Sequence, residues 1–376
     1  MTINSSFSPI LKSNRVRKIA LILPDLNIGG AENVFVNLAN FFVAKGISVD
    51  FVVMNDEGDL KEKLDSRVFF VSLLNAPAGN SISLFLKSII GLVRYLKRSS
   101  PQVLLSTVFG ANLVAIIAAK CIAEPVFVVI RESSSLRNYS RLKKLLIWFF
   151  YPSASQIITV SMAGSRQLNN FLPNSIAKIK VINNGIDVRG VRSLANNLPT
   201  DFSTNSSYIV AVGRFVEAKG FDVLISAFAR VCAVQEGINL IILGDGPLRE
   251  LLESTADKYG IRDRVILPGF VKNPYPYIKY AKLFVLSSRW EGFPNVLIEA
   301  IALGVRVVAT NCDYGPSEIL AEDKNAQLVP VDNAAELFEA INTELSRECL
   351  GGNAPSSIES FNNEKIFEQY LHLIHG

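Results

Sequence analysis

Short apolar runs rich in β-branched residues alternate with helix-length segments along most of the chain. One of these segments, residues 31–46, repeats its apolar residues at the spacing of an amphipathic helix. Near-continuous apolar runs between helices are typical of parallel strands that helices cover on both faces. The predicted strands of the first half are 18–23, 48–53, 68–73, 102–107, 126–131, 156–161 and 178–184.

A polar segment separates this pattern from a second one of the same kind. Residues 183–207 are rich in Asn, Ser, Pro and Gly and lack a periodic apolar pattern, which indicates a linker. Residues 364–374 show helical apolar spacing. The predicted strands of the second half are 208–213, 239–244, 264–269, 283–288, 306–310 and 326–330.

We therefore predict the α/β fold class, with two Rossmann-like, doubly wound parallel-sheet domains that face an interdomain cleft. The expected bounds are 1–190 for the N-terminal domain, 191–207 for the linker, 208–355 for the C-terminal domain and 356–376 for a C-terminal helix. Ligands of such sheets bind beyond the carboxyl ends of the strands, so we expect the chemistry directly after the predicted strands.

Composition narrows the class of protein. The 49% of hydrophobic and 19% of charged residues allow a large core and exclude a globally disordered chain. No apolar run reaches the roughly 18 residues of a spanning helix, and the N-terminal segment shows no secretory signal core, so we expect a cytoplasmic location. The cysteines are isolated, and the histidines are His372 and His375 alone. A His-dependent triad or a multi-His metal site in the body of the protein is therefore excluded.

The charge is distributed unevenly. Residues 1–190 contain 22 Lys and Arg against 11 Asp and Glu, a net +11. Residues 191–376 contain 16 against 23, a net −7, and the two halves sum to the +4 of the whole chain. A basic and an acidic half suggest two domains with different partners. We find no aromatic-basic recognition motif for nucleic acid, so we expect no nucleic-acid partner.

The first candidate site follows the strand 18–23. Gly29 and Gly30 precede a predicted helix, where glycines allow a close backbone approach and the helix N-terminus offers N–H groups to an anion. The spacing differs from the Gly-x-Gly-x-x-Gly dinucleotide fingerprint. A tight strand-to-helix turn is the alternative interpretation.

The second candidate follows the strand 208–213. Arg214 and Lys219 stand five residues apart across a turn before an amphipathic helix. Two cations at this spacing can reach one diphosphate, because Arg binds it in a bidentate manner and Lys adds a point charge. Solvated surface charges are the alternative.

The third candidate is EGFPNVLIE, residues 291–299. Glu291 lies in the loop after a strand, and Glu299 lies about one turn into a helix that starts near Pro294. Two carboxylates can accept hydrogen bonds from different hydroxyls of one extended ligand, and the N–H groups of Gly292 and Phe293 lie near the same place. The alternative is that Glu291 caps the helix and Glu299 is exposed.

A fourth turn, residues 309–320, follows the next strand and should border the same site, although a purely structural turn is equally compatible with it. The sequence contains no Asp-x-Asp and no grouped His or Cys ligands. We therefore expect no metal and no cofactor, so the positive charge for a diphosphate has to come from Arg214, Lys219 and helix N-termini.

Together these motifs resemble glycosyltransferase family 4, the retaining enzymes with the GT-B fold. EGFPNVLIE matches the family's Glu-seven-residues-Glu motif, and GRFVEAKG (residues 213–220) matches its Gly-Arg…Lys-Gly pair. The likeness extends from Gly29 and Gly30 to beyond the second glutamate and so covers most of the chain. It implies a nucleotide diphosphate sugar donor, a final helix that crosses back to the first domain, and no required metal.

The resemblance also assigns roles. Arg214 and Lys219 would bind the donor diphosphate, Glu299 the ribose hydroxyls, and Glu291 the donor sugar and the positive charge at its anomeric carbon. Gly29 and Gly30 would line the phosphate and acceptor side. The implied catalytic residues are Glu291, Arg214 and Lys219, and the implied donor-binding residues are Arg214, Lys219, Glu291, Phe293, Asn295, Glu299, Phe270 and Asn273.

One departure concerns the first domain. Many relatives carry a His near the donor sugar, where this chain has VIRESSS with Arg131 and Glu132, which we assign to the acceptor loop. A His-based proton transfer is therefore in doubt. In the same-face mechanism of retaining GT-B enzymes, the leaving phosphate takes the acceptor proton, and the protein supplies positioning and electrostatic preorganisation.

The basic half suggests a membrane surface. Residues 80–144 carry ten Lys and Arg against two Glu, and 83–100 and 140–151 mix basic with apolar and aromatic residues. Basic amphipathic segments favour an anionic bilayer surface. Ordinary packing helices with solvated basic faces are the alternative.

The segments DYGPSEIL and SSRWEGFPNVLIEA are most similar to bacterial enzymes of surface polysaccharide synthesis. We expect transfer from a nucleotide diphosphate sugar, a UDP-N-acetylhexosamine, to a lipid-linked saccharide of an O-antigen, capsule or other glycan. The enzyme would lie peripherally on the inner face of the cell membrane. A non-catalytic partner subunit of a glycosyltransferase pair and a sugar-nucleotide epimerase of the same fold remain alternatives.

Overall fold

The computed structural model divides the chain into two α/β units, of which unit 1 is Met1–Gly185 with Asn363–Gly376 and unit 2 is Ile186–Asn362. The residues that the structure describes are 16–27, 29–74, 81–198, 207–321, 323, 326–347 and 355–375.

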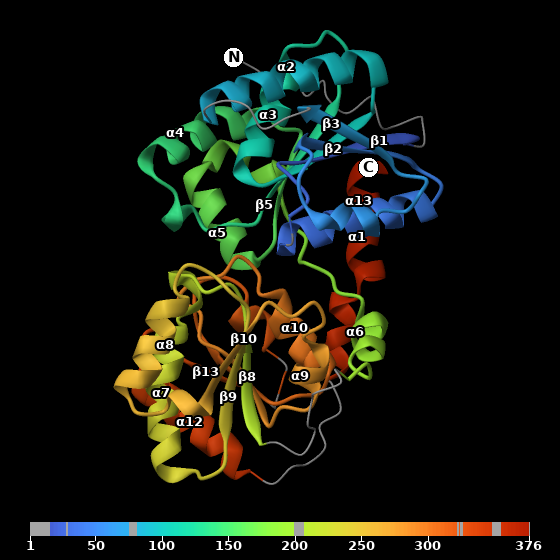
Figure 1. Cartoon of the computed structure of the whole chain (residues 1–376). Coiled ribbons are helices and arrows are strands. Elements are labelled where there is room, and N and C mark those ends of the chain that lie inside the picture. Colours follow the sequence, from blue (N-terminus) through green and yellow to red (C-terminus); the bar gives the residue numbers. More distant parts are fainter. Residues whose placement is uncertain are drawn as a thin grey trace. The chain divides into compact units, whose positions relative to one another are not determined.

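Unit 1 contains a sheet of seven parallel strands in the order β3-β2-β1-β4-β5-β6-β7 (Figure 1). Side chains of β1 alternate between its faces, with Ile19 and Leu21 in one buried cluster and Ala20 and Ile22 in another, as the period of a strand requires. The strands are β1 (Lys18–Leu23), β2 (Ser48–Asn55), β3 (Phe69–Leu74), β4 (Val103–Thr107), β5 (Phe127–Glu132), β6 (Gln156–Thr159) and β7 (Ile179–Val181).

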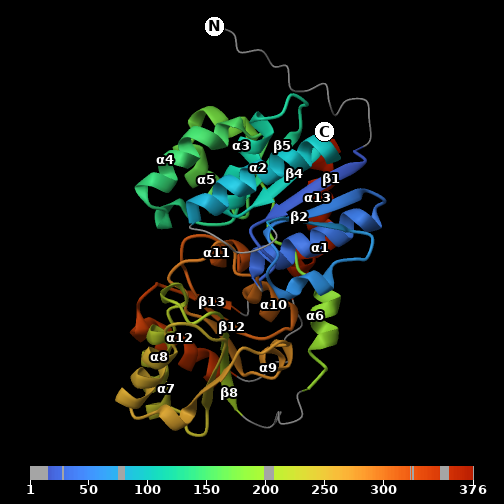
Figure 2. The same ribbon diagram turned by 45° about the horizontal axis from the view of Figure 1, so that its top comes forward.

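Helices cover both faces of this sheet. The first and last helices, α1 and α13, pack on one face, and α2 and α3 pack on the other (Figure 2). The ring of Phe367 in the last helix lies 5.5 Å from that of Phe41 in the first. The helices of unit 1 are α1 (Gly30–Ala44), α2 (Ser81–Ser99), α3 (Phe109–Lys120), α4 (Arg141–Phe150), α5 (Met162–Phe171) and α13 (Asn363–His375).

Unit 2 repeats the design with six parallel strands in the order β10-β9-β8-β11-β12-β13. One face is covered by α7, α8 and α12, whose apolar residues form a buried cluster with β8 and β9. The strands are β8 (Tyr208–Val212), β9 (Asn239–Leu243), β10 (Val265–Gly269), β11 (Leu283–Leu286), β12 (Val307–Thr310) and β13 (Ala326–Val329). The helices are α6 (Val188–Leu194), α7 (Phe221–Val234), α8 (Arg249–Lys258), α9 (Tyr275–Lys279), α10 (Asn295–Ala302), α11 (Pro316–Ile319) and α12 (Ala334–Ser346).

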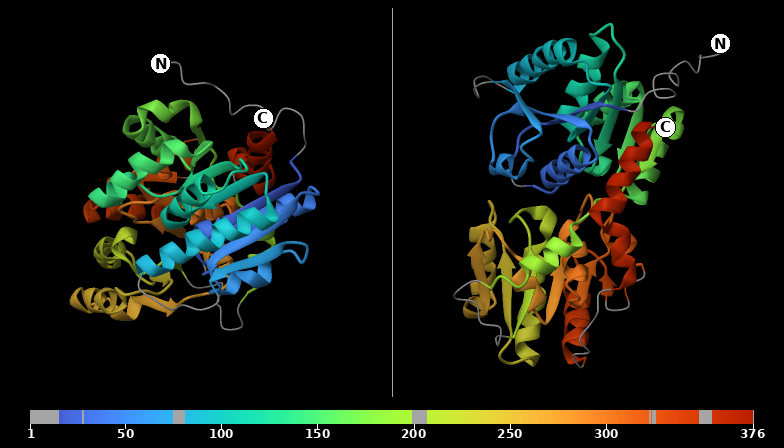
Figure 3. Two further views of the ribbon diagram at one scale, coloured as in Figure 1. Left: turned by 90° about the horizontal axis from the view of Figure 1, so that it is seen from above. Right: turned by 90° about the vertical axis from the view of Figure 1, so that its right-hand side faces the viewer.

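The predicted fold class is confirmed, and a strand lies at every predicted strand position. The segment 183–207, expected to be a linker, contains α6. Asp187 caps this helix by accepting a hydrogen bond from the Gly190 N–H at 2.9 Å, and Val188 and Val191 are buried. The division between the units lies at 185/186, and α13 belongs to unit 1. Figure 3 shows this helix in red at the end marked C. None of the described helices pairs the length of a bilayer crossing with a sufficiently apolar sequence.

Candidate functional site

The strand order of unit 2 reverses between β8 and β11, so the loops after these two strands lie on either side of a topological switch point. In open α/β sheets this is where ligands bind. The loop after β8 carries Arg214 and Lys219, and the loop after β11 carries Glu291. The sheet topology therefore places the second and third candidate motifs at one edge of one sheet.

Lys219 and Glu291 are in contact. The Lys219 ammonium donates to Glu291 Oε1 at 2.6 Å, and the Ser288 hydroxyl donates to the same oxygen at 2.6 Å. The pair is largely buried, since the side chains are 21% and 10% exposed. Lysine has three N–H donors, so two remain for a ligand. Oε2 of the carboxylate accepts no hydrogen bond from the described residues.

Glycines make this contact possible. Gly220 has a φ of +58°, and a Cβ there would lie 2.2 Å from the Ser287 carbonyl oxygen of the neighbouring loop. Ser287 in turn donates to the Lys219 carbonyl oxygen at 2.8 Å. At Gly213, a Cβ would crowd the Lys219 stem at 3.2 Å. The loops therefore pack backbone against backbone, which fixes where Lys219 points.

Arg214 differs from Lys219 because its side chain is exposed. It forms no ion pair or side-chain hydrogen bond with any residue that the structure describes. An exposed guanidinium on the same loop as Lys219 adds a cation to this edge, and with the Lys219–Glu291 pair the local charge is +1. This arrangement favours an anion such as a diphosphate.

Glu299 lies in the second turn of α10 and is partly buried. Its one described hydrogen-bond partner is the Tyr275 hydroxyl of α9, which donates to Oε1 at 3.4 Å. Burial raises the pKa of the Glu299 carboxyl to about 7, and the single long hydrogen bond from Tyr275 opposes this only weakly. The alternative of an exposed Glu299 is therefore wrong.

The turn between the glutamates is packed tightly. Phe293 is buried with its ring 6.0 Å from that of Phe361, and a Cβ at Gly315 in the loop after β12 would lie 2.5 Å from Pro294. The fourth candidate turn therefore contacts the third. Pro294 occupies the cap position, no described side chain caps α10, and Asn295 begins the helix, so Glu291 is not its cap.

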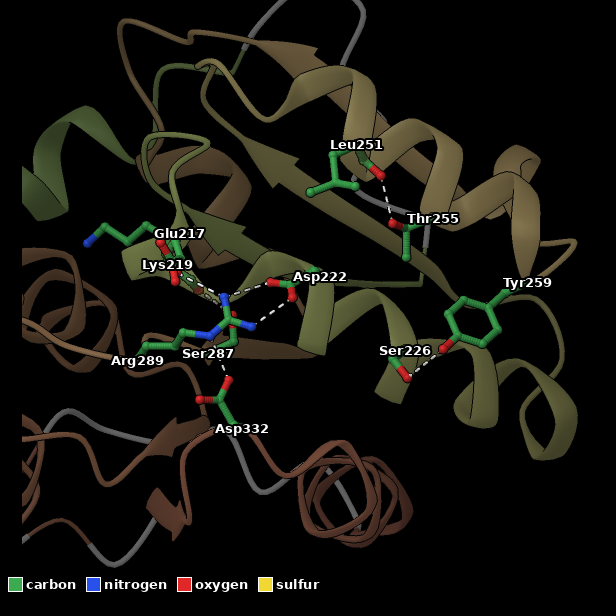
Figure 4. A network of polar contacts seen from close by, with 10 residues as sticks. All are labelled: Glu217, Lys219, Asp222, Ser226, Leu251, Thr255, Tyr259, Ser287, Arg289 and Asp332. Carbon is green, nitrogen blue, oxygen red and sulfur yellow. Dashed lines mark hydrogen bonds and ion pairs between the residues drawn. The ribbon is translucent and has the colours of Figure 1, made fainter.

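Arg289 is a residue that the sequence analysis did not single out. Its guanidinium lies between the carboxylates of Asp222 and Asp332 in Figure 4, with Nη2 to Asp222 Oδ2 at 2.7 Å and Nε to Asp332 Oδ1 at 2.6 Å. Nη1 also donates to the Glu217 carbonyl oxygen at 2.9 Å. The hydrogen bonds to Asp222 raise the pKa of Arg289. Arg289 thus connects the loops after β8, β11 and β13. It stands two positions before Glu291 in the sequence.

In unit 1 the strand order reverses between β1 and β4, and Gly29 and Gly30 follow β1. Gly29 is the cap residue of α1 and Gly30 its first residue. A Cβ at Gly29 would lie 2.2 Å from the Glu32 carboxylate, which folds back over the start of the helix. Burial raises the pKa of Glu32. The absence of a side chain at Gly29 therefore leaves room for the Glu32 carboxylate at the N-terminus of α1.

Arg131 and Glu132, the expected acceptor-loop residues, end β5 and are buried. The Arg131 guanidinium donates to the Thr107 hydroxyl at 3.0 Å and to the Asn184 side chain, and its Nε lacks a partner among the described residues. This burial was not predicted, although the predicted strand 126–131 includes Arg131, because charged residues are almost never fully buried unless they are paired. Their assignment to the acceptor side stays a prediction.

Tyrosines hold the Glu132 carboxyl. Tyr151 donates to Oε2 at 2.7 Å and Tyr139 to Oε1 at 2.9 Å. Burial raises the pKa of Glu132, while these donors and the Ser134 N–H oppose the rise. Both oxygens of the Glu132 carboxyl are therefore hydrogen-bonded at the carboxyl end of β5.

The two base-side candidates lie in the loop after β10. Phe270 is 61% exposed, whereas Asn273 donates to the Leu194 carbonyl oxygen at 2.9 Å and accepts from the Tyr275 N–H. Asn273 therefore fixes this loop on α6. In the described part of the chain, no three His, Cys, Asp or Glu residues are grouped as metal ligands would be.

Two Rossmann-type units with charged loops at their switch points form the GT-B fold. A family model described as Glycosyltransferase Family 4 matches residues 28–189, and one described as Glycosyl transferases group 1 matches residues 199–357. The chain belongs to the GT-B glycosyltransferases of the family 4 type. The resemblance found in the motifs is confirmed.

Relatives and solved structures agree with this family. The chain is 28% identical, over 96% of its length and 100% of the relative, to the N-acetylgalactosamine-N,N'-diacetylbacillosaminyl-diphospho-undecaprenol 4-alpha-N-acetylgalactosaminyltransferase of Campylobacter jejuni. It is 26% identical, over 95% and 98%, to an alpha-1,4-N-acetyl-D-galactosaminyltransferase of that organism. The fold of HepE from Anabaena, in complex with UDP and glucose, matches with a TM-score of 0.79 at 21% identity, over 95% of this chain and 99% of that one.

Proposed function

We propose that this glycosyltransferase retains the anomeric configuration while it transfers an N-acetylhexosamine from a UDP-sugar to a lipid-linked saccharide of a bacterial surface glycan. The observation that carries the proposal is the contact of Lys219 with Glu291 at 2.6 Å, beside the exposed Arg214 at the switch point of unit 2. The full-length relative from Campylobacter jejuni supports the sugar and acceptor, because its name specifies an N-acetylgalactosaminyl group and a diphospho-undecaprenol acceptor.

Arg214 and the free donors of Lys219 suit the donor diphosphate. A charge-assisted hydrogen bond contributes about 1.5–3 kcal/mol. The same two cations stabilise the negative charge that the diphosphate gains as it leaves, without a required metal. Glu299 would accept hydrogen bonds from the ribose hydroxyls, Phe270 and Asn273 would border the base, and Phe293 and Asn295 would line the sugar side.

The reaction breaks the bond between the anomeric carbon and the diphosphate oxygen and forms one to the acceptor hydroxyl oxygen on the same face. The acceptor proton passes to an oxygen of the leaving diphosphate, so no side-chain base is consumed. Oε2 of Glu291, which lacks a described donor, would lie against the positive charge that develops at the anomeric carbon. Because Lys219 and Ser288 fix the carboxylate beforehand, little reorganisation is needed in the transition state.

The acceptor would be bound by unit 1, with Gly29 and Gly30 at its phosphate and with Arg131 and Glu132 supporting the loops beneath. A lipid-linked acceptor requires a membrane surface. In α4 the exposed apolar residues Leu142, Leu145, Trp148 and Phe149 follow helical spacing and lie among basic residues. This composition suits the interface of an anionic bilayer on the inner face of the cell membrane.

A binding and turnover screen tests the function. UDP, GDP and their sugars are titrated by calorimetry, and turnover is then measured with a diphospholipid saccharide, with the anomeric configuration read by NMR. Arg214→Ala should weaken UDP binding about 10- to 150-fold, from the lost charge-assisted bond. Glu291→Gln should lower kcat about 10²- to 10³-fold with a small change in donor affinity.

Matched controls are Arg230→Ala on α7 and Glu250→Gln on α8, which remove the same groups from exposed positions of unit 2. Donor binding without transfer to any lipid acceptor would instead support the non-catalytic partner subunit. Interconversion of the donor sugar without an acceptor would support the epimerase.

The membrane part of the proposal has its own test. Flotation with phosphatidylcholine vesicles that contain phosphatidylglycerol should carry the wild type, and Trp148→Ala with Phe149→Ala should reduce the floated fraction. Absence of salt-sensitive flotation by the wild type would remove the membrane from the proposal and leave the sugar transfer intact.

A further inference from the structure

A cavity of about 610 Å³ lies in unit 1 between the edge strand β3 and helix α2. Lys18, Asp50 and Phe69, which line it, stand near the amino ends of β1, β2 and β3. The candidate site loops follow the carboxyl ends of the strands, so this cavity, here called the α2 groove, is a separate site.

The groove has an excess of positive charge. Its one carboxylate, Asp50, is 2% exposed and is engaged by its neighbours: Lys18 at 3.0 Å, the Tyr95 hydroxyl at 2.5 Å and the Ser99 hydroxyl at 2.6 Å. The Lys18 charge is thereby compensated.

Two arginines supply the excess. Arg94 and Arg98 also line the groove, are exposed, and form no ion pair with a described residue. The net charge of the lining is therefore +2. Basic residues in the last turn of a helix also complement its dipole. The helix dipole accounts for Arg98 but not for Arg94, nor for the cavity between these arginines and β3.

The other wall of the groove is apolar. Phe69, Val71 and Leu73 lie on one face of β3, as the period of a strand requires, and Val71 and Leu73 pack in the cluster that contains Leu92 and Leu96 of α2. Phe69 is 65% exposed. A groove with two exposed guanidinium groups on one side and apolar side chains on the other fits an amphiphile with an anionic head.

The exposed face of α2 extends the same chemistry. Ile82, Leu86 and Ile90 are exposed, and Arg94 and Arg98 continue the series at the same spacing of four. Neighbours in this series lie one turn apart, so Ile90 lies beside Arg94, but each step of four residues turns about 40° around the helix axis, and Ile82 therefore lies far around the helix from Arg98. Amphipathic helices that combine exposed apolar and basic residues lie in the interface of anionic bilayers.

We propose that the α2 groove binds the phosphate of an anionic lipid headgroup between Arg94 and Arg98, with the exposed side chains of Phe69 and Ile90 in the acyl boundary. The inference rests on the membrane attachment proposed above and adds a lipid site to it. The site would hold unit 1 on the bilayer without occupying the donor or acceptor loops.

The test is vesicle binding by the full chain. The double variant Arg94→Ala with Arg98→Ala should bind phosphatidylcholine vesicles containing phosphatidylglycerol about 30-fold more weakly, from about 1 kcal/mol per cation. The matched control, Lys97→Ala with Lys120→Ala, removes two exposed charges of unit 1 outside the groove and should change binding less than about threefold. Equal losses in both pairs would overturn the groove in favour of non-specific attraction.

Further measurements distinguish a lipid site from a site for free anions and from a defect in sugar transfer. Phe69→Ala should weaken vesicle binding without altering its salt dependence, because it removes apolar area only. Inorganic phosphate at matched ionic strength should not release the protein, and release would make the groove a site for free anions, contrary to the proposal. Sugar transfer to a detergent-dispersed acceptor, measured without vesicles, should be equal in the wild type and in the double arginine variant. This assay therefore reports a failure of the proposed sugar transfer independently of vesicle binding.

Discussion

Replacing Glu299 with glutamine tests the electrostatics of unit 2. The carboxyl of Glu299 is partly buried, receives one long hydrogen bond from Tyr275, and has its pKa raised by burial from 4.5 to about 7. Between these values the side chain is neutral in the folded protein and charged in the unfolded chain. Glutamine has nearly the same shape and stays neutral at every pH, so Glu299→Gln removes only the ionisation.

The sign of the effect follows from proton binding. The folded state binds the proton more tightly, so the stabilisation is present below about pH 4.5 and is lost as the pH rises through about 7. The difference of roughly 2.5 pH units corresponds to about 3 kcal/mol. The stability of Glu299→Gln relative to the wild type should therefore grow by about 2–3 kcal/mol between about pH 5 and pH 8.

Urea unfolding followed by tryptophan fluorescence measures this difference. The chain has two tryptophans, Trp148 in unit 1 and Trp290 in unit 2, so a Trp148→Phe background leaves a reporter for unit 2 alone. Glu250→Gln, which removes an exposed carboxyl from α8, is the control and should keep a constant offset from the background protein.

A constant difference between Glu299→Gln and its background at all pH values would refute the reasoning, because Glu299 would then ionise normally in the folded protein. Donor binding supplies an independent readout. If the ribose hydroxyls bind the carboxylate, UDP affinity should rise through about pH 7 in the wild type and stay flat in Glu299→Gln. A rise that persists in the variant would assign the titration to another group.

Arg289→Ala should lower kcat by about tenfold or more with a smaller change in KM, because the loops that align the donor lose their common partner, and Arg289→Lys should restore less than half of the loss. Equal kcat in both variants and the wild type would make the residue purely structural. Gly220→Ala should destabilise unit 2 by more than about 2 kcal/mol in the same fluorescence assay, because a Cβ would meet the Ser287 carbonyl oxygen at 2.2 Å. Tyr151→Phe should cost unit 1 about 1–3 kcal/mol in thermal unfolding, since the buried Glu132 carboxyl loses a donor; an unchanged Tm would contradict this.

The sequence predicts the sheets almost completely because strands such as β1, β4 and β11 are buried along nearly their whole length. β1 begins and ends at the predicted residues 18 and 23, and no strand in the described part of the chain lies outside a predicted run. Buried parallel strands form near-continuous apolar runs, which stand out along the sequence. Helix α6 was missed because its buried face amounts to Val188 and Val191, too few for a detectable period.

Only some residues of the candidate site can be predicted from the sequence around them. Arg214, Lys219 and Glu291 could be found because they follow strands, but Lys219 and Glu291 are 72 residues apart and their contact depends on strand order. Arg289 was missed because its partners Asp222 and Asp332 are 67 and 43 residues away. No local signal marks such a residue, although charged residues in the loops after β8, β11 and β13, at one edge of one sheet, could have suggested an ion-pair network.

The discontinuity of unit 1 has a consequence for biosynthesis. Ile366, Phe367, Tyr370 and Ile374 of α13 belong to the buried cluster of α1, β1 and β2, whereas unit 2 is a single continuous segment. On the ribosome, unit 2 can complete its fold first, while unit 1 waits for α13, which is translated after unit 2. A nascent-chain complex stalled before residue 363 should therefore expose a protease-sensitive first domain beside a resistant second one.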